Sequence, residues 1–234
     1  MRRSEINVKI SSDRSVSVEF ANEISVRINR EIRAFMMLLG DAEILGIVEI
    51  VPTYRAVLIH YEPDVLPYDE LIRHIYEIIE KTKDIDIPRS EVVEVPVCYG
   101  GEFGPDIKTV ADHAGISEKK VIEIHTQPAY LIYMLGFTPG FAYMGGMNKK
   151  IATPRLSTPR VRLEAGSVGI AGEQTGIYPI ASPGGWQIIG RTPLVLFDPK
   201  AENPFLFKAG QRVRFYPITE QEFLNIKKEQ EADA

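Results

Sequence analysis

The second half of the chain carries two copies of a Thr-Pro-Arg unit, at 153–155 and 158–160, followed by Arg162. Proline fixes its own φ angle, so each unit holds its arginine on a stiff piece of backbone. A guanidinium group in a fixed direction binds carboxylate or phosphate oxygens through two parallel hydrogen bonds. The pattern therefore predicts an anion-binding site, with solvated surface charges as the alternative because arginines are usually exposed.

Two glycine-rich stretches flank these arginines. In LGFTPGFAYMGG, at 135–146, glycines alternate with Phe137, Phe141 and Tyr143. Glycine allows a ligand to approach the backbone and aromatic rings supply an apolar wall, which favours a pocket rim; a packed loop is the alternative. In EQTGIYPIASPGGWQIIGR, at 173–191, a Gly-Gly turn precedes Trp186, and its N–H groups could bind an anion. GxxxxGK[ST] occurs nowhere in the chain, which excludes a P-loop.

Histidine and cysteine suggest little further chemistry. None of the 4 histidines stands in an HxH or HxxxH spacing, so no metal site is predicted. His125 is the candidate for proton transfer, although a hydrogen-bonded structural histidine is the favoured interpretation. The single cysteine, Cys98, cannot form a disulfide within the chain; it fits a reducing compartment and a buried, apolar role.

Charge and composition exclude several classes of protein. The formal net charge is −5, whereas nucleic-acid binding needs a clustered basic face. The N-terminal sequence MRRSEINVKI lacks the apolar core of a signal peptide, and no window approaches the ~20 apolar residues that span a bilayer. We therefore expect a folded cytoplasmic protein that binds neither nucleic acid nor membrane.

The first part of the chain alternates strand and helix patterns. Apolar periodicity predicts strand, helix, strand, strand, helix and strand, at 15–20, 22–40, 44–51, 54–61, 67–86 and 92–97. This order is typical of a ferredoxin-like α+β domain with both helices on one face of an antiparallel sheet, although the last strand could lead into the next domain. Charge and proline interrupt the pattern at 83–90, so we expect one domain at 1–88 and another at 89–234.

The second domain is expected to be an all-β barrel or sandwich. Two short helical patterns, at 106–114 and 117–126, meet at Gly115; their nearly cancelling charges disfavour a DNA-reading helix-turn-helix. Short apolar runs separated by turn residues then predict strands, at 130–135, 167–171, 186–189, 194–197 and 212–216. A C-terminal helix is predicted from Thr219 to Lys228, with fraying beyond it.

Five sequence motifs follow one another in the chain: GFTPGFAYMGG, TPR..TPRVR, AGSVGIAGEQTGIYP, SPGGWQIIGRTP and LFDP. In this order they resemble the signature of the KipI family, also called allophanate hydrolase subunit 1 or the B subunit of bacterial 5-oxoprolinase, and the resemblance covers essentially the whole chain. It implies a ferredoxin-like domain followed by a cyclophilin-like β-barrel. It also implies a protein that cleaves 5-oxo-L-proline to L-glutamate with ATP and Mg²⁺, in a complex with an A subunit, and with a paired cyclophilin-like C subunit.

Given that resemblance, residue chemistry suggests roles for particular side chains. The predicted catalytic residues are Arg155, Arg160 and His125. Further arginine contacts, amide-orienting hydrogen bonds and the pocket wall are predicted for Arg162, Arg191, Gln174, Thr175, Tyr178, Gly184, Gly185, Trp186 and Phe141.

Three other activities are alternatives. Some relatives inhibit a sensor histidine kinase by binding its dimerisation domain, and others form the carboxyltransferase of a urea carboxylase or allophanate system. The chain contains no biotin-carrier sequence, which disfavours carboxyl transfer. A cyclophilin-like barrel by itself would suggest prolyl isomerase activity, which we do not expect because a fold does not carry a function.

Overall fold

The computed structural model describes residues 6–82, 85, 87 and 90–232. The chain forms two compact units, Met1–Arg89 and Ser90–Ala234. Within the described residues, no helix is long and apolar enough to cross a membrane.

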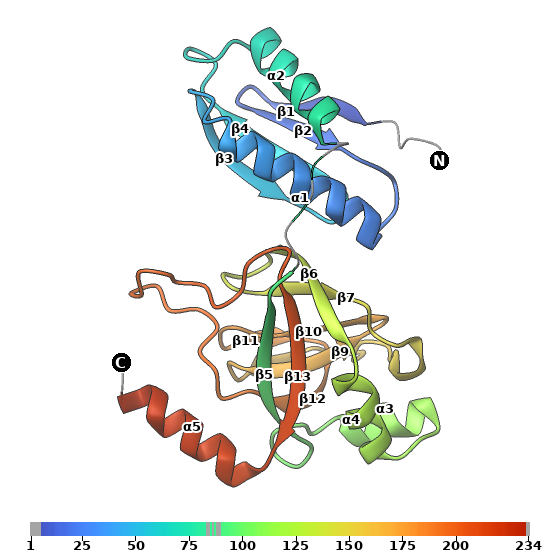
Figure 1. Cartoon of the computed structure of the whole chain (residues 1–234). Coiled ribbons are helices and arrows are strands. Elements are labelled where there is room, and N and C mark those ends of the chain that lie inside the picture. Colours follow the sequence, from blue (N-terminus) through green and yellow to red (C-terminus); the bar gives the residue numbers. More distant parts are fainter. Residues whose placement is uncertain (1–5, 83–84, 86, 88–89, 233–234) are drawn as a thin grey trace. The chain divides into compact units, whose positions relative to one another are not determined.

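The first unit is an antiparallel four-stranded sheet with two helices packed on one face (Figure 1). Its elements are β1 (Asn7–Ser12), β2 (Ser15–Glu19), α1 (Val26–Asp41), β3 (Ile47–Pro52), β4 (Ala56–Tyr61) and α2 (Tyr68–Lys81), and the strand order is β1-β2-β4-β3. Alternate strand residues such as Val16 and Val18 are buried against Phe35 and Ile75 of the helices. This apolar layer is the core of the unit.

The predicted α+β class is confirmed, but the order of its elements is ββαββα. The expected order missed β1, an edge strand with mostly exposed side chains, and it counted the segment at 92–97 as the fourth strand. That segment belongs to β5 (Val92–Tyr99) of the second unit, because its pairing partners lie there, so the alternative that it leads into the next domain is confirmed. α1 begins later than the predicted range of 22–40, because Ser25 is its N-cap and accepts a 3.2 Å hydrogen bond from the N–H of Ile28. Much of the predicted boundary at 83–90 falls outside the described residues.

The second unit is a closed barrel with the strand order β10-β7-β6-β13-β5-β12-β9, so the barrel expectation is confirmed over the sandwich (Figure 1). Its remaining strands are β6 (Ala129–Leu135), β7 (Ala142–Gly145), β9 (Ser167–Ala171), β10 (Gln174–Ile177), β12 (Gln187–Arg191) and β13 (Arg212–Ile218). β5 and β13 run parallel, which requires the long connection that the intervening strands supply. Val95, Tyr130, Ile170 and Phe215 fill the interior.

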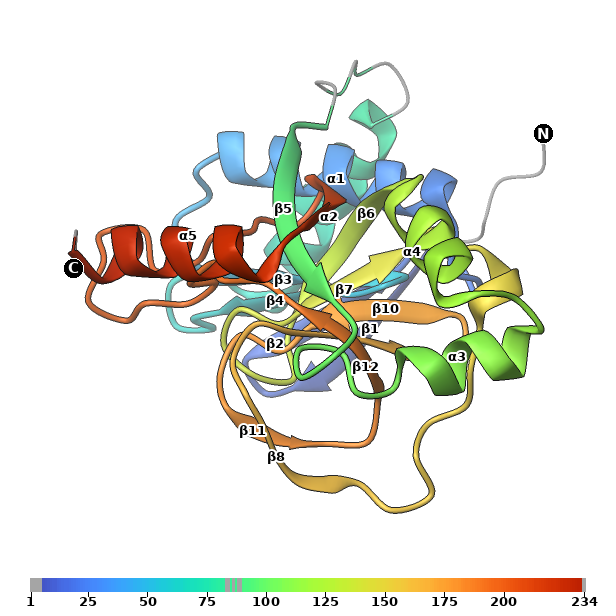
Figure 2. The ribbon, with the colours of Figure 1, turned by 90° about the horizontal axis from the view of Figure 1, so that it is seen from below.

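Helices and one hairpin surround this barrel. α3 (Ile107–Ala114) and α4 (Glu118–Thr126) meet at Gly115, with φ +65°, as the sequence predicts, and a 3₁₀ turn η1 (Lys149–Ile151) follows later. The C-terminal helix α5 (Glu220–Ala232) extends beyond Lys228 into the segment that was expected to fray. β8 (Arg160–Leu163) and β11 (Ser182–Gly184) pair antiparallel in a separate two-stranded sheet beside the barrel (Figure 2). Their pairing continues the register of the β9–β10 hairpin, so we call the pair the β8–β11 hairpin. The strand predicted at 194–197 does not form; within it, Phe197 makes only an isolated β-bridge to Phe205.

Candidate functional site

Four aromatic side chains gather on the outside of the barrel wall, and we call them the outer aromatic cluster. Phe141 lies at its centre, with ring centroids 5.1 Å from Tyr143, 5.8 Å from Tyr178 and 5.7 Å from Trp186, all edge to face. Gly176 of β10 permits this packing, because Phe141 and Trp186 atoms lie 3.2 Å from where a Cβ would stand. The residues on either side of Gly176 point into the barrel, so the cluster occupies the opposite face.

Arg155 joins this cluster from the exposed loop before β8. Its guanidinium carbon lies 6.0 Å from the centroid of the Trp186 ring, within the range of a cation–π interaction. Burial raises the pKa of the Tyr178 hydroxyl, while a backbone hydrogen bond from Trp186 and the charge of Arg155 act in the opposite direction. The site therefore combines a fixed positive charge with a neutral phenol.

The glycine-rich turn brings backbone against the same cluster. A methyl group at Gly184 would lie 2.5 Å from the Tyr178 hydroxyl oxygen, so only glycine fits there without a shift. The carbonyl of Gly185 accepts a 2.8 Å hydrogen bond from the N–H of Leu156, directly after Arg155. The turn and the arginine loop are thus one hydrogen-bonded unit beside the aromatic rings.

His125 and Thr175 lie together inside the barrel, away from this surface. Thr175 Oγ1 donates to Gly169 O at 3.1 Å and so accepts from His125 Nε2 at 2.8 Å, which leaves Nδ1 to accept from the Tyr99 hydroxyl at 2.8 Å. Burial lowers the pKa of His125 to about 3, so the ring is neutral at physiological pH. Neither side chain reaches the outer surface, and of the polar pair on β10 only Gln174 points to the outer side.

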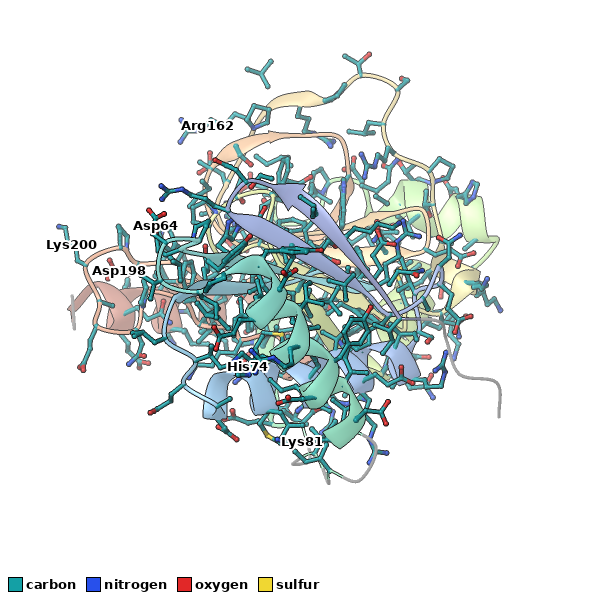
Figure 3. The ribbon with its side chains drawn as sticks, turned by 90° about the horizontal axis from the view of Figure 1, so that it is seen from above. Asp64, His74, Lys81, Arg162, Asp198 and Lys200 are labelled. Atoms are coloured by element: carbon teal, nitrogen blue, oxygen red, sulfur yellow. The ribbon has the colours of Figure 1, made fainter. Side chains whose placement is uncertain are left out.

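Two further predicted arginines are held by carboxylates. Arg160 Nη2 lies 2.7 Å from Oδ1 of the buried Asp106, and exposed Arg162 Nε lies 3.1 Å from Oε1 of Glu164. Figure 3 shows the Arg162 side chain at the periphery of the unit. Asp106 was missed from the sequence because Arg160 stands 54 residues away, so no local spacing pointed to the pair.

Arg191 serves the C-terminal helix rather than the cluster. Its guanidinium carbon lies 4.8 Å from the ring centroid of Phe103 and 5.3 Å from that of Phe223 in α5. Two such stacking contacts on one guanidinium group hold its plane in place. The described contacts of Arg191 therefore do not include the outer aromatic cluster, and its substrate contact stays a prediction.

The donor groups at the outer aromatic cluster suit anions. They are a guanidinium, a phenol and the backbone around a glycine turn, none of them a carboxylate ligand for a cation. Among the residues that the structure describes, no three His, Cys, Asp or Glu side chains converge to hold a metal ion. The arrangement has the chemistry to bind an anion against an apolar wall, on a closed barrel that follows a small α+β unit.

A comparison with known families identifies the class of protein. Residues 6–207 match the family described as carboxyltransferase domain, subdomain C and D, and the chain belongs to this family. Within it, the chain is 42% identical to the 5-oxoprolinase B subunit of Bacillus subtilis over 228 residues, which cover 93% of this chain and 95% of that protein. It is 45% identical to the protein of the same name from Escherichia coli O157:H7, over 75% of this chain and 80% of that protein. The family resemblance found in the motifs is confirmed.

Solved structures extend the comparison. PH0987 of Pyrococcus horikoshii is 44% identical with a TM-score of 0.56, covering 93% of this chain and 100% of that one. TTHA0988 is 36% identical with a TM-score of 0.77, over 88% of this chain; the present chain spans only 40% of that longer protein. A urea amidolyase of Saccharomyces cerevisiae is 24% identical over 91% of this chain, which corresponds to 13% of that protein.

Proposed function

We propose that this chain is the B subunit of an ATP-dependent 5-oxoprolinase and that, with its partner subunits, it converts 5-oxo-L-proline to L-glutamate in the cytoplasm. The single observation that carries the proposal is the similarity to the Bacillus subtilis protein along nearly the whole length of both chains. The name of that relative indicates further subunits, and we assign two of them, the paired cyclophilin-like C subunit plus the A subunit.

The chemistry explains why ATP is needed. The ring of 5-oxoproline is an unstrained amide, and resonance makes its carbonyl carbon a poor electrophile. Transfer of the terminal phosphoryl group of ATP to the amide carbonyl oxygen, with ADP as the leaving group, makes the carbonyl carbon electrophilic. Water then adds to this carbon, the ring C–N bond breaks, and hydrolysis of the resulting acyl phosphate releases glutamate and phosphate. Stabilising the charge that moves in such steps calls for positioned cations.

Within this scheme, Arg155 binds an anionic oxygen of the substrate or of the transferred phosphoryl group. Its contact with Trp186 limits the directions of the guanidinium group, so less freedom is lost on binding. The outer aromatic cluster packs against the methylene groups of the substrate ring. Gln174 and Tyr178 supply hydrogen bonds to its amide.

We assign ATP and Mg²⁺ to surfaces that the partner subunits provide or complete. Mg²⁺ in nucleotide sites is held by one or two carboxylates together with phosphate oxygens. The groups at the outer aromatic cluster do not include such a carboxylate, so the described residues of this site do not fit the metal. No step of the present scheme therefore depends on a metal held by this chain.

The direct test is reconstitution. This chain is mixed with its purified partner subunits, and glutamate released from 5-oxoproline is measured with and without ATP. We expect release only when this chain and ATP are both present. Release at the same rate without this chain would contradict the proposal.

Carboxyl transfer is the second candidate, favoured by the description of the matched family and by the distant similarity to urea amidolyase. It requires carboxybiotin as the donor. Transfer of labelled carboxylate from carboxybiotin to urea by the reconstituted complex, without glutamate release, would support it over the oxoprolinase proposal.

A further inference from the structure

The carboxylate of Asp106 is a buried junction between segments that are far apart in the sequence. Oδ1 accepts a 2.7 Å hydrogen bond from Arg160 Nη2 in β8, and Oδ2 accepts one of 2.7 Å from the N–H of Ile188 in β12. The backbone of Asp106 also bonds to Ile188, because the Asp106 N–H donates a 2.9 Å hydrogen bond to the Ile188 carbonyl. Only 7% of Asp106 is exposed.

These contacts differ from those expected of an aspartate at the start of a helix. Asp106 is the N-cap of α3, a position where the side chain commonly accepts a hydrogen bond from the first helical turn. Within the described part of the chain it makes no such bond, and both oxygens face distant strands. Asp106 is buried and Arg160 is partly exposed, and an ion pair of this kind adds little net stability but leaves a destabilising charge on Asp106 if the arginine is removed. Its contribution is therefore to geometry.

The Arg160 arm of this junction leads to the arginine loop. In the β8–β11 hairpin, Arg160 pairs with Gly184, whose backbone packs closely against the Tyr178 hydroxyl. The next residue, Gly185, accepts the hydrogen bond that fixes the backbone after Arg155. A displacement of Arg160 would therefore move Gly184 and Gly185, and with them the loop that carries Arg155.

The Ile188 arm leads to the aromatic rings. Ile188 packs in the same apolar group as Phe141 and Trp186 on the outer face of the barrel. The Asp106 carboxylate thus contacts both the β8–β11 hairpin, through Arg160, and the barrel strand β12, through Ile188. Both contacts connect Asp106 to elements that carry the candidate site.

We propose that Asp106 is a positioning residue for this site: through Arg160 and Ile188 it sets the placement of the β8–β11 hairpin over the outer aromatic cluster, and with it the placement of Arg155. Its effect on turnover rests on the proposed function, whereas its effect on the hairpin does not. Arg160 shares this role instead of contacting substrate. Its Nη2 is held by Asp106, and its Nη1 is buried without a partner among the described residues.

The test uses Asp106→Asn, which keeps the shape and an acceptor for the Ile188 N–H but removes the charge that holds Arg160. Trp186 is the chain's single tryptophan, so the emission of the isolated full chain reports on the hairpin and cluster. We expect the emission to shift to longer wavelength. In the reconstituted complex we expect kcat to fall by about ten-fold or more, because small misplacements of a binding group cost that much.

Rescue and control variants separate positioning from general damage. Arg160→Gln added to Asp106→Asn restores a neutral hydrogen-bonding pair and is expected to recover most of the lost kcat. Asp112→Asn, an exposed carboxylate on the same helix paired with Lys108, should match the unaltered chain in both readouts. If Asp106→Asn does not fold, Arg160→Lys, which keeps the charge without the planar fork, is measured in its place.

Unchanged Trp186 emission, or a kcat within about two-fold of the unaltered complex, would overturn the positioning role. Absence of turnover in the unaltered complex would instead overturn the proposed function. In that event the emission measurement still decides whether Asp106 positions the hairpin.

Discussion

At the scale of single residues, burial decides which polar groups of the barrel can meet a ligand. Arg155 is exposed and stacked over Trp186, so its charge is available to an anion. His125 is enclosed, and hydrogen bonds occupy both of its ring nitrogens. Both residues were named as candidates from the sequence, with a hydrogen-bonded structural role favoured for His125, and their surroundings separate them.

The enclosed His125 predicts an acid-sensitive fold. Its folded-state pKa of about 3 lies below the usual value of 6.5, so the unfolded chain takes up a proton that the folded chain refuses. The stabilising contribution is complete above pH 6.5 and is lost as the pH falls toward 3, by about 1.4 kcal/mol per pH unit. We expect His125→Gln, which cannot titrate, to flatten the pH dependence of the free energy of unfolding in this window, measured by urea denaturation.

The matched control is His113→Gln, because His113 is exposed on α3. That variant should keep the pH dependence of the unaltered chain. An equally steep loss of stability in His125→Gln and in the unaltered chain would show that His125 is not responsible.

At the scale of elements, the β8–β11 hairpin depends on close backbone packing. A methyl group at Gly184 would lie 2.5 Å from the Tyr178 hydroxyl oxygen and from Leu163 Cδ1, whereas one at Gly185 has no atom nearer than 3.5 Å. We expect Gly184→Ala to lower the free energy of unfolding by about 1–3 kcal/mol and Gly185→Ala to change it by less than about 0.5 kcal/mol. Equal effects of the two substitutions in urea denaturation would contradict this account of the hairpin.

Helix α5 offers a second test at this scale. Phe223 is buried against Phe103 and Arg191, while its neighbour Leu224 is 41% exposed. We expect Phe223→Ala to cost about 3 kcal/mol and to open α5 to limited proteolysis, and Leu224→Ala to cost less than about 1 kcal/mol. Similar protease resistance in both variants would count against Phe223 as the anchor.

The elements that the sequence predicted best are those with long periodicity. α1, α2 and the β3–β4 hairpin carry enough repeats of an apolar pattern to be recognised, whereas β8 and β11 have 4 and 3 residues, too few to show alternation. The strand at 92–97 was recognised, and of the two memberships left open the one in the second unit is observed. Its pairing with β13 joins residues 120 positions apart, for example Arg212 with Val92, which no local pattern reveals.

At the scale of the whole molecule, the candidate site could be predicted as a set of segments but not as a set of contacts. The glycine-rich, arginine-containing and aromatic segments lie close together in the structure. They bring together Arg155, Phe141, Tyr178, Gly184 and Trp186. Which arginine would remain available depended on distant partners, since Arg160 and Arg191 are engaged by residues from other segments.

The comparison of whole chains leads us to expect that this protein acts together with other polypeptides. It matches nearly all of the 5-oxoprolinase B subunit of Bacillus subtilis but only 40% of TTHA0988. Its candidate site places the exposed Arg155 over an aromatic wall, and the proposed role of that arginine is to bind and orient an anion. We expect the isolated chain to release no glutamate from 5-oxoproline.

The measurement that tests the central claim most directly is the rate of glutamate release by the reconstituted complex with Arg155→Ala. We expect kcat/KM to fall roughly ten- to hundred-fold, the effect of losing one charge-assisted hydrogen-bonding group, with the circular dichroism of the chain unchanged. Arg162→Ala, which removes an exposed arginine paired with Glu164, should leave the rate unaltered. Equal rates for the Arg155→Ala and unaltered complexes would contradict the assignment of the outer aromatic cluster as the functional site.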